Sequence, residues 1–303
     1  MNKMSETLQS LVKAIEARCY GTGMTFRAVE LSKNNGTVRY GVQVGNSNSS
    51  IGEVVYVEDV LCLLESGEVD EEEAAEAFEN VFIDSWSYEN NKVEDFVNKV
   101  ISGKESILAN VKYNLVNREW NAELLSKVPY KEVLDLVAIY EITSENGEFS
   151  TKVTYELMKH YGITKQELEE AASKNKREYI TKDIFDVLID MLSKDRRAKE
   201  LEKMKRQPGG FDMYVITAKS KIKGASAMLY PENFETLAKE LHSDLYIIPC
   251  SIHELIVMPT YLEIPPEVIT GYIQLINVEN VEPEERLSNH VYFYKRGSMQ
   301  VVM

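Results

Sequence analysis

The chain has 303 residues, which is enough for about two domains at roughly 150 residues each. Hydrophobic residues make up 44% of it and charged residues 27%, proportions typical of a globular protein, and no apolar stretch reaches the roughly 18 residues of a membrane span. The formal net charge of −15 would repel a phosphate backbone, so we expect no general nucleic-acid binding.

The cysteines and the first residues favour a cytoplasmic protein. Cys19, Cys62 and Cys250 are odd in number and far apart in the sequence, which fits reduced thiols better than a disulfide framework. Residues 1–20 carry charges within an apolar pattern and lack a small-residue cleavage site, which predicts a helix and no signal peptide. We therefore expect a cytoplasmic location and no association with a membrane.

We expect an N-terminal α+β domain over residues 1–120. Its apolar periodicity predicts a helix that ends near Arg18, followed by a hairpin of strands 24–31 and 37–44. The Asn-Asn-Gly sequence at 34–36 favours the hairpin turn, because these residues tolerate positive φ.

A strand over 51–57 would complete a three-stranded antiparallel meander. The helices predicted after it span 58–64, 69–86 and 93–101. The second of these opens with four acidic residues, 70–73, which complement the helix dipole. A cation site is the alternative interpretation, but the run lacks the spacing and the central glycine of a calcium loop.

We expect a C-terminal α+β domain over residues 121–303, with a helical segment at 151–206. The apolar run 134–142 predicts a buried strand, although its periodicity leaves a helix open. In the helical segment we expect Ser150 or Thr151 to cap a helix that ends at Gly162. Thr164 and Glu167 form a capping box for the next helix, and a further helix is predicted over 184–192.

The rest of this domain, residues 212–303, is predicted to form a mixed or antiparallel sheet. Its centre is a strand-strand-helix-strand-strand unit, with strands at 213–217, 225–229, 245–248 and 255–258 and a helix that begins at Pro231. A helix from Pro265 and Pro266 to about 276 and a hairpin of 291–294 and 299–302 are predicted to follow it. The expected fold class is therefore α+β.

The turn at 249–254 carries the most distinctive cluster of polar side chains. Cys250 and His253 could supply half of a zinc site or a thiolate–imidazole pair, but the remaining histidines have no paired spacing and position 257 is Val, so no HExxH motif follows His253. We expect no metal and no cofactor. Residues in a turn between two core strands are held rigidly, so we predict that Cys250, Ser251, His253 and Glu254 form a recognition site.

Other catalytic motifs are missing from the sequence. Gly21 and Gly23 lack the third glycine of a dinucleotide-binding fingerprint, and no P-loop or nucleophile elbow occurs. With 49 acidic residues in the chain, pairs of carboxylates carry no information about acid–base chemistry. We therefore predict no catalytic residues.

The stretches MYVITAKSKIKGASAMLYP and SDLYIIPCSIHELIVMP, and less closely YGITKQELEEAA and EERLSNHVYFY, resemble a family of uncharacterised proteins from anaerobic Firmicutes. That family is catalogued only as a domain of unknown function, and the similarity extends loosely to the N-terminal region. The resemblance implies a cytosolic protein of mobile or accessory gene content and supplies no activity. Members tend to carry Ser in place of Cys250, which argues against a catalytic thiol.

These observations favour a non-catalytic binding or adaptor module with a protein partner. One alternative is a hydrolase that uses His253 and Glu254 with a metal ion or water. Another is an acidic protein that imitates nucleic acid toward a DNA-binding protein, as its charge of −15 allows.

Overall fold

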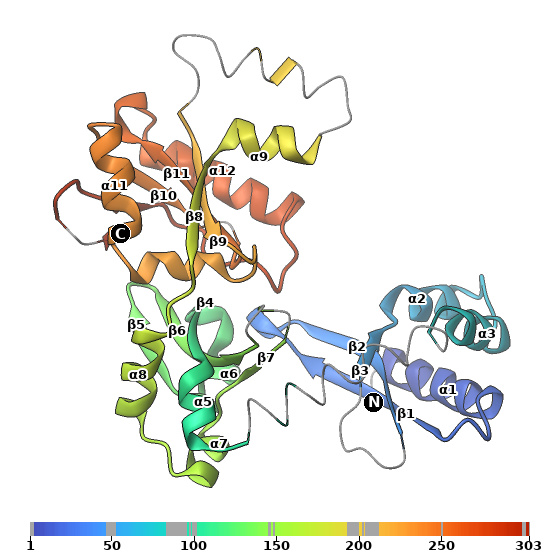
Figure 1. Ribbon diagram of the computed structural model, residues 1–303. Coiled ribbons are helices and arrows are strands. Elements are labelled where there is room, and N and C mark those ends of the chain that lie inside the picture. The colour runs from blue at the N-terminus through green and yellow to red at the C-terminus, as the bar shows by residue number, and fades with distance from the viewer. Residues whose placement is uncertain are drawn as a thin grey trace. The chain divides into compact units, whose positions relative to one another are not determined.

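The computed structural model describes most of the chain, in the residue ranges 3–46, 53–82, 96, 98, 102–144, 147, 149–192, 200–201, 203, 212–249, 251–298 and 301–302. The chain divides into two compact units, Met1–Ser102 and Gly103–Met303 (Figure 1). This division lies earlier than the predicted boundary at 120/121. The physical reason is strand β4 (Val111–Asn117), which pairs along its whole length with β6 (Leu136–Thr143) of the second unit.

The first unit combines helices with an antiparallel meander, as predicted. Its elements are α1 (Lys3–Arg18), β1 (Met24–Ser32), η1 (Asn34–Gly36), β2 (Val38–Asn46), β3 (Glu53–Tyr56), α2 (Glu58–Ser66) and α3 (Glu71–Phe82). The sheet order is β1-β2-β3, and η1 makes the hairpin turn with positive φ at Asn35 and Gly36. The predicted helix over 93–101 lies almost entirely outside the described residues.

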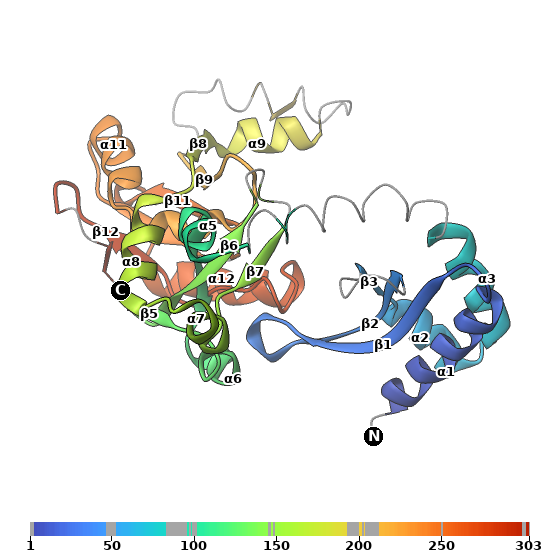
Figure 2. The same cartoon turned by 60° about the horizontal axis from the view of Figure 1, so that its bottom comes forward.

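Helix α1 carries the core of the first unit and runs alongside β1 (Figure 2). Its buried residues Leu8, Leu11 and Ile15 repeat at helical spacing and pack in one cluster with residues of the sheet, α2 and α3. At the end of α1, Arg18 forms ion pairs with Glu72 (2.6 Å) and Glu79 (2.8 Å) of α3. These carboxylates therefore attach one helix to another.

The second unit contains two antiparallel sheets. One has the order β4-β6-β5, with β7 also paired to β6, and the other has the order β13-β12-β10-β11-β9-β8. The remaining strands are β5 (Tyr130–Val133), β7 (Ser150–Lys152), β8 (Tyr179–Asp183), β9 (Tyr214–Ala218), β10 (Leu245–Ile248), β11 (Glu254–Pro259), β12 (Tyr292–Tyr294) and β13 (Val301–Val302). The fold class is α+β, as predicted.

Helical elements of the second unit connect and cover these strands. They are α5 (Lys104–Asn110), η2 (Glu119–Asn121), α6 (Ala122–Leu125), α7 (Tyr155–Tyr161), α8 (Lys165–Lys174), α9 (Ile184–Met191), η3 (Gly224–Leu229), α11 (Glu232–Glu240), η4 (Thr260–Leu262) and α12 (Pro266–Glu279). Thr164 and Glu167 form the predicted capping box of α8, and Gly162 ends α7 with positive φ. No helix in the described ranges is both long and apolar enough to cross a membrane.

Three local predictions in this unit are wrong. Residues 225–229 form the 3-10 helix η3 instead of a strand. The amides of Gly224 and Ala225 donate hydrogen bonds to the turn after β10, and the two strands that pair with β9 are β8 and β11. Ser150 and Thr151 belong to β7, and Thr154 caps α7. The segment 151–206 is therefore not purely helical, since it contains part of β7 and the whole of β8.

The six-stranded sheet is covered differently on its two faces. On one face, Phe234 of α11 packs against Tyr294 of β12, with ring centroids 5.7 Å apart. On the other face, Ile248 and Met258 form a buried cluster with Ile269 and Ile273 of α12. This second cluster sits over β10 and β11, and the same face continues across β9 to the edge strand β8.

A buried ion pair attaches the smaller sheet to the loop before η3. Glu141 on β6 is 3% exposed, and it pairs with the ammonium group of Lys223. Lys223 Nζ also donates to Ser150 Oγ (2.7 Å), and Asn114 Nδ2 donates to Glu141 Oε1 (3.2 Å). Burial by itself would raise the pKa of Glu141, but the charge and hydrogen bond of Lys223, together with the charges of Lys152 and Arg177, outweigh burial and hold the pKa below its ordinary value.

Breaking this pair should destabilise the protein strongly. In Lys223→Met, Glu141 remains buried without its counter-ion, and we expect the free energy of unfolding to fall by about 3 kcal/mol. Lys219→Met is the matched control, because Lys219 and Glu178 form an exposed pair (3.2 Å) whose loss should cost less than about 1 kcal/mol. Urea unfolding at pH 7 measures both changes, and equal losses would contradict the role of the pair.

A second carboxylate ties α11 to the C-terminal hairpin and should titrate at an unusually low pH. Glu235 accepts hydrogen bonds from the Tyr294 hydroxyl and the Gly297 amide, and together with Lys239 these hold its pKa at about 2. Its contribution to stability is therefore present above the ordinary pKa of 4.5 and is lost as the pH falls through about 2.

We expect Tyr294→Phe to raise the pKa of Glu235 toward 4.5, because the hydroxyl is the largest cause of the shift. Lys239→Met should raise it less, since Lys239 acts more weakly than either hydrogen bond. Carboxyl chemical shifts followed by NMR between pH 1.5 and 7 (about the range in which carboxylates titrate) measure both. An unchanged pKa in Tyr294→Phe would contradict the assignment.

Candidate functional site

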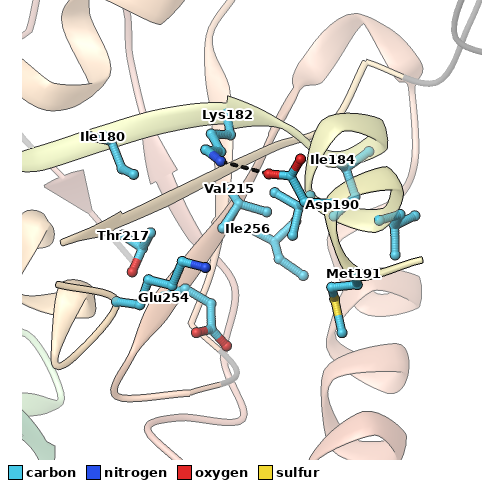
Figure 3. A pocket seen from close by; sticks show the side chains of 12 residues that line it. Ile180, Lys182, Ile184, Asp190, Met191, Val215, Thr217, Glu254 and Ile256 are labelled. Atoms are coloured by element: carbon cyan, nitrogen blue, oxygen red, sulfur yellow. Dashed lines mark hydrogen bonds and ion pairs between the residues drawn. The ribbon is translucent and has the colours of Figure 1, made fainter. Parts of the chain in front are cut away.

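A cavity of about 560 Å³ opens on the six-stranded sheet beside its edge strand β8. Its floor is one face of the sheet, where two neighbouring rows of side chains each run across β8, β9 and β11. One row is Ile180, Thr217 and Glu254, and the other is Lys182, Val215 and Ile256 (Figure 3). Strand pairing therefore places side chains from three distant segments on one surface.

Helix α9 forms the wall of the cavity. Asp183, the last residue of β8, caps this helix by accepting a hydrogen bond from the Phe185 amide (2.8 Å), so the chain passes from floor to wall without a loop. Residues at i, i+3, i+4 and i+7 of the helix line the cavity, namely Ile184, Val187, Leu188 and Met191. This spacing places them on one side of the helix. The predicted helix over 184–192 is confirmed, and its apolar side lines the cavity.

The charged residues of the cavity fall into two groups. Lys182 of the floor and Asp190 of the wall form an ion pair (2.9 Å), so their charges compensate each other (Figure 3). Lys221 belongs with this pair, because its charge also lowers the pKa of Asp190. Glu254 is the second group. Burial raises the pKa of the Glu254 carboxyl above its ordinary value. Within the described part of the chain, no carboxylate forms an ion pair with Lys221.

Lys221 reaches the cavity from a tight turn after β9. Its amide donates to the carbonyl of Ala218 (2.7 Å), and its φ is 61°. Lys223, two residues later, also has positive φ, at 56°. Left-handed backbone at a residue other than glycine is strained, and it persists only where its surroundings hold it. Here the buried contact between Lys223 and Glu141 supplies that restraint.

Gly224 joins this loop to the predicted recognition turn. Its amide donates to the carbonyl oxygen of His253 (2.9 Å), and the Thr217 hydroxyl donates to the same oxygen (2.8 Å). A Cβ atom at Gly224 would lie 2.3 Å from the Ala218 nitrogen and 2.5 Å from the His253 oxygen. Position 224 therefore requires glycine, because the loop backbone lies directly against the backbone of Ala218 and His253. This contact holds the loop after β9 against the turn before β11.

The four predicted site residues do not form one cluster. Glu254 lies in the floor of the cavity, whereas Cys250 lies outside the described residues. Ser251 is buried, and its hydroxyl accepts a hydrogen bond from the His253 amide (2.9 Å). The side chain of His253 is held by protein groups at both ring nitrogens: Nδ1 accepts from the Lys223 amide (3.3 Å), and Nε2 lies 3.3 Å from Glu285 Oε1.

Two residues of the turn at 249–254, Ser251 and Ile252, are buried. They are 5% and 9% exposed, because a loop around Glu285 and Arg286 covers them. The Ile252 amide donates to the Glu285 carbonyl (2.8 Å), and Ser251 forms an isolated antiparallel bridge with Arg286. The turn is therefore packed, and its contact with the cavity is made through Glu254.

A second pair of a histidine and a carboxylate, His290 and Asp135, lies outside the cavity lining. Asp135, in the turn between β5 and β6, lies 2.8 Å from His290 Nδ1 through Oδ2 and accepts from the Tyr292 hydroxyl through Oδ1. The contacts attach the smaller sheet to the segment before β12, and they explain why the pKa of Tyr292 is raised by burial and by Asp135. In the described ranges, no group of three or more His, Cys, Asp or Glu residues is placed to bind a metal ion.

Sequence reasoning identified Glu254 and missed most of the cavity. The missed residues are Ile180, Lys182, Val215, Thr217, Lys221, Ile256 and the α9 wall. The available signal was the run of apolar residues at i, i+3, i+4 and i+7 in 184–191, which indicates an apolar helix face but not its neighbour. The pairing of β8, which ends at Asp183, with β9, which begins at Tyr214, joins segments that are distant in the sequence, so it has no local signature.

Comparison with known proteins gives a family and no function. A model described as a family of unknown function, DUF5688, matches residues 4–296. No curated protein and no solved structure matches the chain.

Two glycine substitutions test the geometry of the cavity end. In Gly224→Ala the new methyl group would meet backbone atoms that cannot move independently, and we expect unfolding to become easier by at least about 2 kcal/mol. Gly271→Ala is the control, because a Cβ in that position of α12 meets nothing within 4 Å and should stabilise the helix by about 0.5–1 kcal/mol. Thermal unfolding distinguishes the two, and a neutral Gly224→Ala would contradict the close approach.

Proposed function

The chain belongs to the family of unknown function DUF5688, and we propose that it is a non-catalytic binding module whose cavity holds a small, mainly apolar molecule. The observation that supports this best is the cavity itself. Its volume of about 560 Å³ falls within the range of about 300–1,000 Å³ that is common for small-molecule sites. A cytoplasmic location, favoured by the scattered cysteines, is part of the same proposal.

The chemistry of the lining supports binding of an apolar body. Val215 and Ile256 in the floor and Leu188 in the wall are aliphatic, and the lining also includes polar and charged residues. Such a mixture gives affinity through burial of apolar surface and orientation through few polar contacts. Leu188 is 37% exposed and Met191 77% exposed, so both offer apolar surface that a ligand would cover.

The contacts of His253 favour binding over the hydrolase alternative. A general base needs a free ring nitrogen within reach of its substrate. In this protein the Lys223 amide donates to Nδ1 and Glu285 lies beside Nε2. Both ring nitrogens of His253 are therefore engaged by protein groups in this arrangement, which does not favour a general base.

Filling the cavity should abolish binding of an apolar probe. We expect Nile red, a neutral dye that fluoresces in apolar surroundings, to bind the full chain saturably at one site. In Leu188→Trp the indole would occupy the cavity, and we expect affinity for the dye to fall at least about tenfold, which corresponds to about 1.4 kcal/mol. A fluorescence titration measures the change.

The matched control is Val278→Trp on α12. Val278 is 72% exposed and lies outside the cavity lining, so this variant adds the same side chain to an apolar surface without filling the site. Its affinity for the dye should equal that of the parent. If the dye does not bind saturably, or if both variants bind it equally, the cavity is not the binding site.

A further inference from the structure

We infer that the exposed side of α12 is a docking surface for an amphipathic helix with basic ends, supplied by a partner protein. This surface lies outside the cavity lining, so the inference does not depend on the proposed binding of a small molecule. It follows from a stripe of apolar side chains, from the charges at both ends of that stripe and from a glycine within it.

Helix α12 carries apolar side chains on two of its sides. On one side, Ile269 and Ile273 are buried against the six-stranded sheet. On the other side, four large apolar residues at i, i+4, i+7 and i+10 are between 45% and 72% exposed. They form the exposed stripe, which consists of Val268, Tyr272, Leu275 and Val278. A helix on the surface of a protein normally has polar residues opposite its buried side, so a continuous apolar stripe there indicates an interaction surface.

Acidic residues lie at both ends of the exposed stripe. Glu263 and Glu267 are exposed near its beginning, and Glu279 and Glu282 are exposed near its end. In the described part of the chain, none of these four carboxylates forms an ion pair. Positions 240–285 contain no lysine or arginine, and Arg286 donates hydrogen bonds to carbonyl oxygens at the C-terminal end of α12. The surface therefore combines an apolar middle with acidic ends.

Gly271 lies within the exposed stripe, next to Tyr272 and about one turn from Leu275. A Cβ atom at this position would meet nothing within 4 Å, so no contact in the described ranges requires a glycine. Glycine in the interior of a helix is less stable than alanine, and it suits positions where another backbone approaches closely. We therefore place the crossing point of the partner helix at Gly271.

The charges distinguish a partner helix from other occupants of this surface. If α12 packed against α12 of a second copy, acidic ends would meet acidic ends in either helix direction, and like-charge contacts are costly. An anionic lipid surface would be repelled in the same way. An amphipathic helix with Lys or Arg at both ends would cover the apolar stripe and pair with the carboxylates at the same time.

Three labelled peptides test the chemistry of the partner. The first has about 18 residues, which is about 27 Å as a helix and spans α12; its leucines recur on one side, and each end carries a pair of lysines. The second has glutamate in place of each lysine, and the third keeps the lysine ends but scatters the leucines. We expect the first to bind the full chain saturably, and the other two to bind at least about tenfold more weakly. Fluorescence anisotropy measures the affinities.

A substitution in the exposed stripe identifies the surface. Leu275→Gln should weaken binding of the first peptide at least about tenfold, because it removes an apolar contact from the middle of the stripe without changing the charge. The matched control is Leu63→Gln, since Leu63 is an exposed leucine of the acidic helix α2 in the other unit. This variant should bind the peptide as the parent does.

Gly271→Ala should have opposite effects on stability and on docking. It should stabilise the free chain, but its methyl group would hold the partner helix away and weaken binding of the first peptide at least about fivefold. Thermal unfolding and anisotropy measure the two effects. A role confined to the helix itself would not change the affinity, so unchanged binding in this variant would overturn the inference.

The remaining outcomes also decide between occupants. Equal affinity for the lysine and glutamate peptides, or equal binding by Leu275→Gln and the parent, would overturn the inference. Sedimentation of the full chain as a dimer that Leu275→Gln dissociates would assign the stripe to a second copy. Binding to phosphatidylglycerol vesicles that is lost in Leu275→Gln would assign it to a membrane, and either result overturns the partner helix. Leu188→Trp should leave peptide binding unchanged, so a failure here is distinguishable from a failure of the proposed function.

Discussion

The contact between Lys223 and Glu141 is the interaction on which the site depends. A carboxylate that is 3% exposed is costly unless a counter-ion and hydrogen bonds compensate its charge, and Lys223, Asn114 and neighbouring cations do so. To reach Glu141, the loop after β9 takes a strained path with positive φ at two lysines. The same path places Gly224 on the His253 carbonyl and Lys221 at the cavity.

This arrangement explains why Glu254 and His253, although adjacent in sequence, have different roles. Glu254 is the first residue of β11 and lines the cavity, whereas His253 belongs to the turn before the strand and lies beside Glu285. Both ring nitrogens of His253 then serve the packing of the turn. The result is a cavity with a restrained backbone at one end and a largely apolar surface, as the proposed binding function requires.

The N-terminal unit follows a simpler logic. One helix, α1, buries its apolar face, and ion pairs of Arg18 with α3 join its C-terminal end to the acidic helix. The acidic side chains of α3 that pair with Arg18 therefore stabilise the contact between the two helices. We find no arrangement in the described residues of this unit that adds to the proposed site.

The sequence by itself determined the features that depend on neighbouring residues. The amphipathic faces of α1 and α9, the turn at Asn35 and Gly36, the capping box of Thr164 and Glu167 and the helix end at Gly162 are all set by side chains within one or two turns of each other. The resemblance to a family of unknown function was likewise carried by short stretches and is confirmed. Only the tertiary structure decided that 225–229 forms η3, that β8 occupies the edge beside β9, and that Glu254 lines a cavity together with side chains of β8, β9 and α9. These outcomes depend on the ion pair with Glu141 and on backbone contacts between distant segments, and such long-range contacts leave no periodic pattern in the sequence.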